Sequence, residues 1–387
     1  MPTEGPLSGV RVLEFGHYIA APFCTQVLAD QGADVIKVEP PGGGPRRNSD
    51  PVRNKGGYFP MLNRNKRSIE VDLKSDRGRE VLDALVRSAD VLVTNYGDSV
   101  PGKLGLGYDR LRDVNPRLVY VHITGFGHDS PYAAKPAYDG IIQAMSGLLH
   151  LTGEPGRPPA LAGVFVPDHV TGLYSALAVM FGLRNRDVTG HGSFTDLAML
   201  DSMLTFLGAL PSNVADLGEH PVRSGGKVPR SYAGVHPASD GWIYLAPMAP
   251  RMWEGVAKVI GDPSLLEFYS SAPGSVDTRM EHRAPLDERI DKWTSEHTVE
   301  EIERAMAAVN VACSPIFTIE RIVADPNVAH RKLLRTVTLP GGHVRHVVAS
   351  PFDVDEATYA ASPPLVGQHT DEILAEVGMS AAAEGAA

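Results

Sequence analysis

Short β-branched runs alternate with helical patterns along the first third of the chain, and this alternation constrains the fold more than any other feature. A helix is expected at 22–28, and another follows Ser75, a residue type that caps helices. Strands alternating with helices imply an α/β fold with a mostly parallel sheet, whose ligands bind near the carboxyl ends of the strands. The expected strands lie at 10–15, 34–38, 68–73, 91–94 and 118–123.

The second half of the chain predicts a further, smaller domain. Helical patterns are expected at 167–184 and from Asp196 onward, and 211–231 then has the Gly, Pro and polar content of a linker. Beyond the linker the patterns are of mixed α and β type. They comprise a strand at 241–245 and helices at 250–260, 286–294 and 299–309.

Composition limits the partners of the protein. The 387 residues, 43% of them hydrophobic, can bury a large core. The 36 basic and 46 acidic side chains give a net charge of -10, and no block of Lys or Arg offers the surface that nucleic acid or an anionic membrane needs. Neither is an expected partner.

The expected location is the cytoplasm. Cys24 and Cys313 lie far apart, which excludes a disulfide framework and favours a reducing compartment. Residues 1–10 lack the basic and apolar stretches of a signal peptide. The longest apolar stretch, at 175–183, is too short to cross a bilayer, which takes about 20 residues.

Three familiar catalytic or metal-binding patterns are absent from the sequence. The chain has no G-x-S-x-G, H-E-x-x-H or C-x-x-C motif, so neither a serine hydrolase nor a structural zinc site is predicted, and no metal is expected. Cys24 lies among apolar helical positions, where we expect a buried, inert thiol.

Residues 97–104 nearly match the phosphate-binding loop of nucleotide hydrolases. Leu104 replaces the hydroxyl that would hold magnesium, and Gly105 and Gly107 interrupt the helix that would receive the phosphates. Nucleotide hydrolysis is therefore not expected. What remains is a loop that carries Lys103 at the end of a parallel strand. This loop either contacts a phosphate or an adenine, or is a solvated turn.

Asp168 follows Pro167 at the expected first turn of a helix. The helix dipole favours acidic side chains there by about 0.3–1 kcal/mol, and most such side chains only cap the helix. The same helix dipole would also keep a partly buried carboxylate ionised and able to attack a carbonyl carbon. Position alone leaves both roles open.

Seven ordered blocks of sequence resemble the family III CoA-transferases, also called the CaiB/BaiF family. This family includes formyl-CoA transferase, carnitine CoA-transferase and α-methylacyl-CoA racemase. The resemblance covers nearly the whole chain and is strongest before Asp201. The blocks lie at 21–30, 32–39, 65–69, 104–108, 115–120, 124–127 and 365–370.

The resemblance implies a Rossmann-like large domain formed by residues 1–210 and by the C-terminal part of 316–387, which begins with a return linker. The linker at 211–231 leads into a small α+β domain at 232–315 that is inserted between these parts. Family members form interlocked homodimers, with the active site between the large domain of one subunit and the small domain of the other.

The resemblance also assigns the chemistry. Asp168, within the segment 167–172, aligns with the nucleophile of the transferases. It would move CoA from an acyl-CoA to a carboxylic acid through anhydride and aspartyl-CoA thioester intermediates, without metal or ATP. Tyr138 and Asp139 align with positions beside the reacting carboxylate and are expected to bind substrate. The expected CoA contacts are Ile19, Ala20, Val71, Leu73, Lys74, Asn95, Tyr96, Gly97 and Lys103.

The chain departs from the family pattern at two places. Pro40 stands where some members have an arginine, so Arg46, Arg47 or Lys103 is expected to supply the charge near the nucleotide. The tetraglycine loop of the oxalate-using transferases is reduced to Gly225 and Gly226, which disfavours oxalate and formate as substrates.

Two other functions remain as alternatives. A racemase needs two bases at the α-carbon, but the histidine of the racemases is Tyr138 here, and their small-domain glutamate aligns with Ala249. A tyrosine phenol, with an ordinary pKa of about 10, is a poor proton shuttle at neutral pH. A non-catalytic CoA-binding protein is the second alternative, and an intact Asp168 disfavours it.

Overall fold

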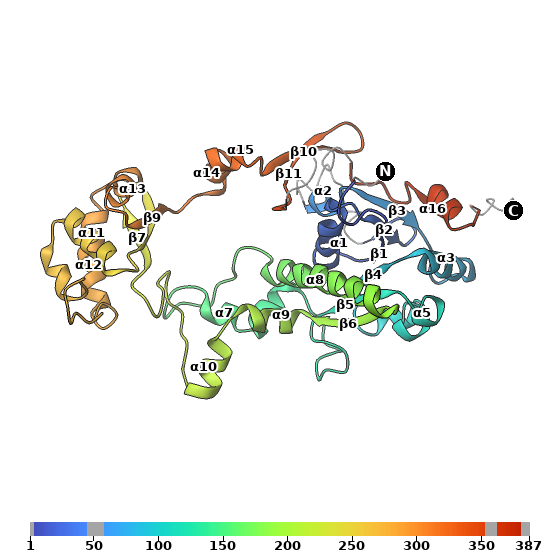
Figure 1. The fold of residues 1–387 in the computed structure, drawn as a ribbon, viewed down its shortest axis with the longest axis horizontal. Coiled ribbons are helices and arrows are strands. Elements are labelled where there is room, and N and C mark those ends of the chain that lie inside the picture. The colour runs from blue at the N-terminus through green and yellow to red at the C-terminus, as the bar shows by residue number, and fades with distance from the viewer. Residues whose placement is uncertain (1–3, 45–57, 353–361, 381–387) are drawn as a thin grey trace. The chain divides into compact units, whose positions relative to one another are not determined.

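The computed structural model describes residues 4–44, 58–352 and 362–380 (Figure 1). Their contacts divide them into two compact units. The large unit comprises described residues within 1–148, 161–219 and 326–387, and the small unit comprises 149–160 and 220–325. Among the described residues, no helix is long and apolar enough to cross a membrane.

A six-stranded sheet forms the centre of the large unit. All neighbouring strands are parallel and lie in the order β3-β2-β1-β4-β5-β6, the order of the doubly wound nucleotide-binding folds. The predicted parallel sheet is confirmed. The strands are β1 Arg11–Phe15, β2 Asp34–Glu39, β3 Lys66–Glu70, β4 Val91–Thr94, β5 Val119–Thr124 and β6 Ser193–Ala198.

Helices cover both faces of this sheet because successive side chains of a strand point to opposite faces. Val12 of β1 packs in the core beneath α1 (Ala20–Asp30) and α8 (Val166–Thr189). Leu13 packs in the opposite core, beneath α3 (Asp76–Ser88). Helices α5 and α16 lie on that second face, and α9 lies on the first; they span Tyr108–Val114, Thr370–Glu376 and Met199–Phe206.

The other elements of the chain outside the small unit's core are short. Strands β10 and β11 pair antiparallel and pack near α2, whereas α4, α6, α7, α10, α14 and α15 connect larger elements. Their bounds are α2 Tyr58–Asn63, α4 Val100–Lys103, α6 Asp139–Met145, α7 Leu148–Leu151, α10 Leu210–Leu217, α14 Ile319–Val323, α15 Pro326–His330, β10 Leu334–Thr338 and β11 Val344–Val348.

The small unit contains an antiparallel sheet in the order β7-β8-β9. Ile243 and Leu245 of β8 are buried in its core around Trp253, whereas Trp242 and Tyr244 on the alternate positions are exposed. Its elements are β7 Gly234–Ala238, β8 Gly241–Ala246, β9 Ala312–Pro315, α11 Pro250–Ile260, the short 3-10 helix η1 Pro263–Glu267, α12 Arg283–Thr294 and α13 Val299–Ala307.

Three predicted elements differ from the structure. The helix expected from Asp196 is strand β6 at that position, and α9 begins only at Met199; β6 is an edge strand with partly exposed side chains, so its sequence lacks a buried apolar run. Strand β3 begins at Lys66 rather than at 68. Its first side chain is a lysine, which is buried in the structure but does not belong to an apolar run in the sequence. The segment expected to be only linker begins with α10, which tolerates Pro211 in its first turn.

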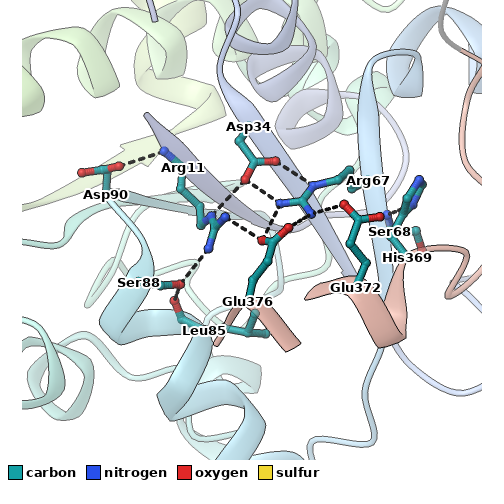
Figure 2. Close-up of polar contacts among 10 residues, drawn as sticks. All are labelled: Arg11, Asp34, Arg67, Ser68, Leu85, Ser88, Asp90, His369, Glu372 and Glu376. Atoms are coloured by element: carbon teal, nitrogen blue, oxygen red, sulfur yellow. Dashed lines mark hydrogen bonds and ion pairs between the residues drawn. The ribbon is translucent and has the colours of Figure 1, made fainter. Parts of the chain in front are cut away.

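An ion-pair cluster fastens the C-terminal helix to the amino ends of three strands (Figure 2). Arg67 Nη2 lies 2.6 Å from Asp34 Oδ2, and Arg67 Nη1 lies 2.7 Å from Glu376 Oε1. Arg11 contacts the same two carboxylates at 2.9 and 2.7 Å. Hydrogen bonds from Arg67 hold the pKa of Glu376 below its ordinary value. Helix α16 therefore depends on charges from β1, β2 and β3.

We expect Arg67→Ala to release α16 from the sheet. The substitution removes guanidinium contacts to both Asp34 and Glu376, so the free energy of unfolding should fall by about 2 kcal/mol, the scale of hydrogen bonds to charged groups. Hydrogen exchange of the amides in 370–377 should accelerate. Arg304→Ala, which removes an exposed pair with Glu300, should cost about 0.5 kcal/mol. Unchanged exchange in 370–377 would contradict the role of Arg67.

Candidate active site

A cavity of about 1040 Å³ opens in the large unit at the carboxyl ends of its central strands. Strands β1 and β4 are neighbours, but the chain leaves them toward opposite sides of the sheet. A crevice between the following loops is the expected ligand site of such a sheet. The lining includes residues 17–20 after β1, 95–100 after β4, 123–126 at the end of β5 and just beyond it, 138–140 and Asp168.

The structure brings together all but one of the predicted site residues that it describes. Lys103 is the exception, because it is exposed at the end of the α4 turn and does not line the cavity. Arg46 and Arg47 lie outside the described residues. The lining residues that were predicted are Ile19, Ala20, Val71, Leu73, Lys74, Asn95, Tyr96, Gly97, Tyr138, Asp139 and Asp168.

Asp168 lies in the first turn of α8, as predicted, and is half-buried in the cavity wall. Its backbone N–H donates to Asp139 Oδ2 at 3.3 Å. Gln143 Nε2 donates to the other oxygen of Asp139 at 2.6 Å, and Gln143 Oε1 accepts from the Ala162 N–H at 3.1 Å. Burial raises the pKa of Asp139, although these hydrogen bonds oppose the rise. Asp139 thereby fixes the backbone that carries Asp168.

Tyr138 lies at the N-cap position of α6, lines the cavity and is 63% exposed. Its ring meets the ring of Tyr18 edge-on, with centroids 6.1 Å apart. Tyr18 has φ of 59°, in the left-handed region that costs a non-glycine residue about 1–3 kcal/mol. A residue keeps such a strained conformation only where the surrounding structure fixes its backbone.

His17 also lines the cavity, although no motif in the sequence predicts it as a site residue. Its backbone N–H donates to Asn95 Oδ1 at 2.9 Å, and its carbonyl accepts from Asn95 Nδ2 at 2.8 Å, so Asn95 joins the loops after β1 and β4. Burial, and then the charge of Lys37, lower the pKa of His17 to about 4. The ring is therefore neutral at neutral pH. Its position directly after β1 was the signal available in the sequence.

No sequence pattern predicts the buried carboxylate of Glu14, which lies beneath the cavity. Glu14 is completely buried, and its oxygens lie 2.5 Å from Lys37 Nζ, 2.7 Å from Lys66 Nζ and 2.6 Å from Thr25 Oγ1. Burial would raise the pKa of Glu14, but the two lysines lower it to about 2. Lys37 Nζ also donates to the Gly16 carbonyl at 3.0 Å. The cluster thus holds the start of the loop that carries His17 and Tyr18.

Cys24 is fully buried in the core beside this cluster. Burial raises the pKa of its thiol far above the neutral range. A neutral thiol with no access to solvent is neither a nucleophile nor a metal ligand. The prediction that Cys24 is a core residue is confirmed.

We expect Glu14→Gln to lower the free energy of unfolding by about 3–5 kcal/mol, because it leaves two buried ammonium groups without their carboxylate. The pKa of Glu14 lies below its ordinary value of 4.5, so its contribution is complete above about pH 4.5 and is lost as the pH falls toward 2. Denaturant titrations at pH 7 and pH 3 measure both effects.

Glu80→Gln is the matched control, because Glu80 is exposed in an i,i+3 pair with Arg77. It should change the free energy of unfolding by less than about 0.5 kcal/mol. A Glu14→Gln variant as stable as the Glu80→Gln variant would show that the buried cluster does not support the fold.

Comparisons with known proteins agree with this arrangement. Residues 7–370 match the family described as CoA-transferase family III. The succinate–glutarate CoA-transferase of Agrobacterium fabrum is 35% identical over 96% of both chains, and the succinyl-CoA:mesaconate CoA-transferase of Haloarcula hispanica is 33% identical over 97% of both. A CaiB/BaiF family protein from Brucella suis has a similar structure, with a TM-score of 0.83, 32% identity and coverage of 97% of this chain and 100% of that one.

The match spans nearly the whole chain, and the identities exceed 30% over almost the full length of both relatives. The resemblance found in the sequence motifs is confirmed. The chain therefore belongs to CoA-transferase family III and is an enzyme of this kind.

Proposed function

We propose that the chain transfers CoA from an acyl-CoA thioester to a carboxylic acid, with Asp168 as the covalent nucleophile. The position of Asp168 carries this proposal: the carboxylate lies at the N-terminus of α8, in the wall of the same cavity as the predicted CoA contacts. The positive end of the helix dipole favours the ionised, nucleophilic form of such a carboxylate.

The proposed reaction consists of two matched half-reactions. Asp168 attacks the thioester carbonyl and expels CoA thiolate, which gives a mixed anhydride. The thiolate then attacks the Asp168 carbonyl carbon and releases the donor acid, which leaves an aspartyl-CoA thioester. The acceptor carboxylate attacks this thioester and expels CoA thiolate, which gives a second mixed anhydride. The thiolate then attacks the acceptor acyl carbon, which forms the new acyl-CoA and regenerates the Asp168 carboxylate. Because each C–S bond broken is replaced by another, the thioester free energy is retained and the steps need no ATP; as proposed, no step uses a metal ion.

The surrounding residues support this sequence of steps. Asp139 holds the backbone of Asp168, and Tyr138, exposed in the same cavity lining, is proposed to donate to the reacting carboxylate. Lys74 and Lys135 line the cavity and carry positive charge for acidic ligands. Since similar proteins are named for succinate, glutarate and mesaconate, we propose dicarboxylic acids and their CoA esters as substrates. Transfer from succinyl-CoA into a panel of acids, followed by mass spectrometry, tests this.

We expect Asp168→Asn to abolish transfer and to leave CoA binding within about threefold. The amide has the shape of the carboxylate but cannot form the anhydride, so the barrier should rise by several kcal/mol, with each 1.36 kcal/mol worth about tenfold in rate. Steady-state rates and calorimetric titration with CoA measure the two effects. Asp109→Asn, on the surface helix α5, is the control and should behave as wild type.

A variant that kept a tenth of the wild-type rate would contradict the nucleophile assignment. Hydroxylamine should trap an acyl group on the wild-type enzyme and none on Asp168→Asn. With 2-methylacyl-CoA in deuterated water and no acceptor acid, we expect no enzyme-dependent deuterium at the α-carbon. Rapid uptake there would instead identify a racemase, with Asp168 acting as a base.

We also propose that the enzyme is an interlocked homodimer with an inserted small domain at 232–315. Helix α8 supports this proposal, because one side of it exposes large apolar side chains that a second subunit could cover. These are Leu173, Leu177, Met180, Phe181 and Val188.

Interlocked subunits should not exchange without unfolding. We expect that native mixing of tagged and untagged protein yields no mixed dimers over hours, whereas joint denaturation and refolding yields them. Pull-down with native mass spectrometry distinguishes the two results. Mixed dimers within minutes of native mixing, or a monomer at micromolar concentration, would contradict the proposal.

A further inference from the structure

The wall of the cavity contains a residue with a strained backbone. Tyr18 has φ of 59°, and among the described residues it is the one non-glycine residue of the cavity lining with a positive φ. This left-handed conformation is unfavourable for a tyrosine, whereas glycine adopts it easily. Because the chain has a tyrosine at this position, its side chain is expected to have a role that offsets the strain.

The backbone on both sides of Tyr18 is fixed, and this enforces the strained conformation. The N–H of His17 donates to Asn95 Oδ1, and the carbonyl of His17 accepts from Asn95 Nδ2. On the other side, Ile19 is the N-cap of α1, and its carbonyl accepts from the Phe23 N–H at 2.7 Å. A substitution at position 18 therefore changes the side chain while these contacts retain the backbone conformation.

The rings of His17 and Tyr18 contact two different parts of the cavity wall. The His17 ring packs against the ring of Tyr96 in the loop after β4, with centroids 4.9 Å apart and planes at 31°. The Tyr18 ring meets the Tyr138 ring edge-on, with centroids 6.1 Å apart and planes at 85°. Edge-to-face pairs at this separation are a favoured arrangement of aromatic rings. The loop after β1 therefore contacts both the loop after β4 and the start of α6.

Little else holds the side chain of Tyr138. It is 63% exposed, and within the described part of the chain Tyr18 provides its one aromatic contact. Its hydroxyl, which can both donate and accept, forms no hydrogen bond with any residue that the structure describes. An exposed side chain without such contacts samples several rotamers within nanoseconds. The contact with Tyr18 therefore selects among the rotamers of Tyr138.

We propose that Tyr18 is a positioning residue for the transfer reaction, because its ring holds the Tyr138 phenol in the rotamer that donates to the reacting carboxylate. The inference rests on the proposed function, in which Tyr138 donates to this carboxylate. Tyr18 touches no reacting atom in this role and acts only through Tyr138. The strain in its backbone is thus retained for function rather than for stability.

Two substitutions separate the strain from the ring. Tyr18→Gly and Tyr18→Ala both remove the ring, but only glycine adopts a φ of 59° without strain. We expect Tyr18→Gly to unfold about 2 °C or more above Tyr18→Ala, the reverse of the usual order for these two residues. The exposed Lys332, with φ of 51°, is the matched control. Lys332→Gly should likewise be more stable than Lys332→Ala, and both should transfer CoA at the wild-type rate.

Steady-state kinetics measure whether the Tyr18 ring acts through Tyr138. Tyr18→Gly and Tyr18→Ala should each lower kcat about tenfold, the effect of one misplaced hydrogen bond, and should change KM for the acyl-CoA less than twofold. Tyr18→Phe retains the ring and should keep at least half of the wild-type kcat. In a Tyr138→Phe background, which lacks the hydroxyl, Tyr18→Gly should lower kcat less than twofold further.

Several outcomes would overturn the proposal. Equal losses of kcat in the two backgrounds would show that Tyr18 does not act through the Tyr138 hydroxyl. Wild-type kcat in Tyr18→Gly, or a loss in Tyr18→Phe as large as in Tyr18→Gly, would show that the ring contact has no such role. A Tyr18→Gly variant less stable than Tyr18→Ala would show that the backbone is not strained.

Fluorine NMR of protein labelled with 3-fluorotyrosine, recorded without ligand, separates this inference from the proposed function. Tyr138→Phe identifies the Tyr138 resonance among those of the 12 tyrosines. In Tyr18→Gly this resonance should move toward that of free fluorotyrosine, whereas in Lys332→Gly it should stay in place. A wild-type protein that shows this pattern but transfers no CoA would refute the proposed function and leave the positioning of Tyr138 in place. Transfer by the wild type with an unmoved resonance in Tyr18→Gly would refute the positioning role alone.

Discussion

The ion pairs of the buried Glu14 carboxylate are the interaction on which the cavity end of the large unit depends. It lies on β1 and joins Lys37 of β2, Lys66 of β3 and Thr25 of α1. Removing these charges from water is costly, and it is tolerated because each oxygen of Glu14 accepts from at least one donor. The lysines also bond to the carbonyls of Gly16 and Pro22, so the cluster fixes the turn between β1 and α1 as well as the strands.

The two ends of the same sheet therefore have different structural roles. At the amino ends of β1, β2 and β3, charged side chains hold the C-terminal helix (Figure 2). At the carboxyl ends, the strand order separates the loops after β1 and β4, and Asn95 links them again through the backbone of His17. The strand order keeps these two loops apart, so a cavity remains between them. The hydrogen bonds of Asn95 hold the loops in place around it.

The sequence predicts best where local pattern and tertiary burial agree. Strands such as β4 and β5 are buried along their whole length, so they read as apolar runs. Strand β6 is at the sheet edge and half-exposed, so its sequence lacks a buried apolar run and wrongly predicts a helix. Asp168 could be placed at a helix start from Pro167, but only the family resemblance suggested its chemistry. The Glu14 cluster joins residues up to 52 positions apart, and no local pattern signals such a pairing.

The proposed nucleophile and the predicted CoA contacts are supported by separate elements of the fold, which suits the proposed covalent mechanism. The predicted CoA contacts lie mainly on loops that follow strands, and these loops are positioned by the sheet and by Asn95. Asp168 instead lies on α8, where Asp139 and Gln143 hold the helix start. During the proposed reaction, the carboxylate must exchange acyl groups while CoA stays bound as thiolate and as thioester. Because Asp168 lies on a separate helix, the proposed changes in its covalent state need not disturb the loops that carry the predicted CoA contacts.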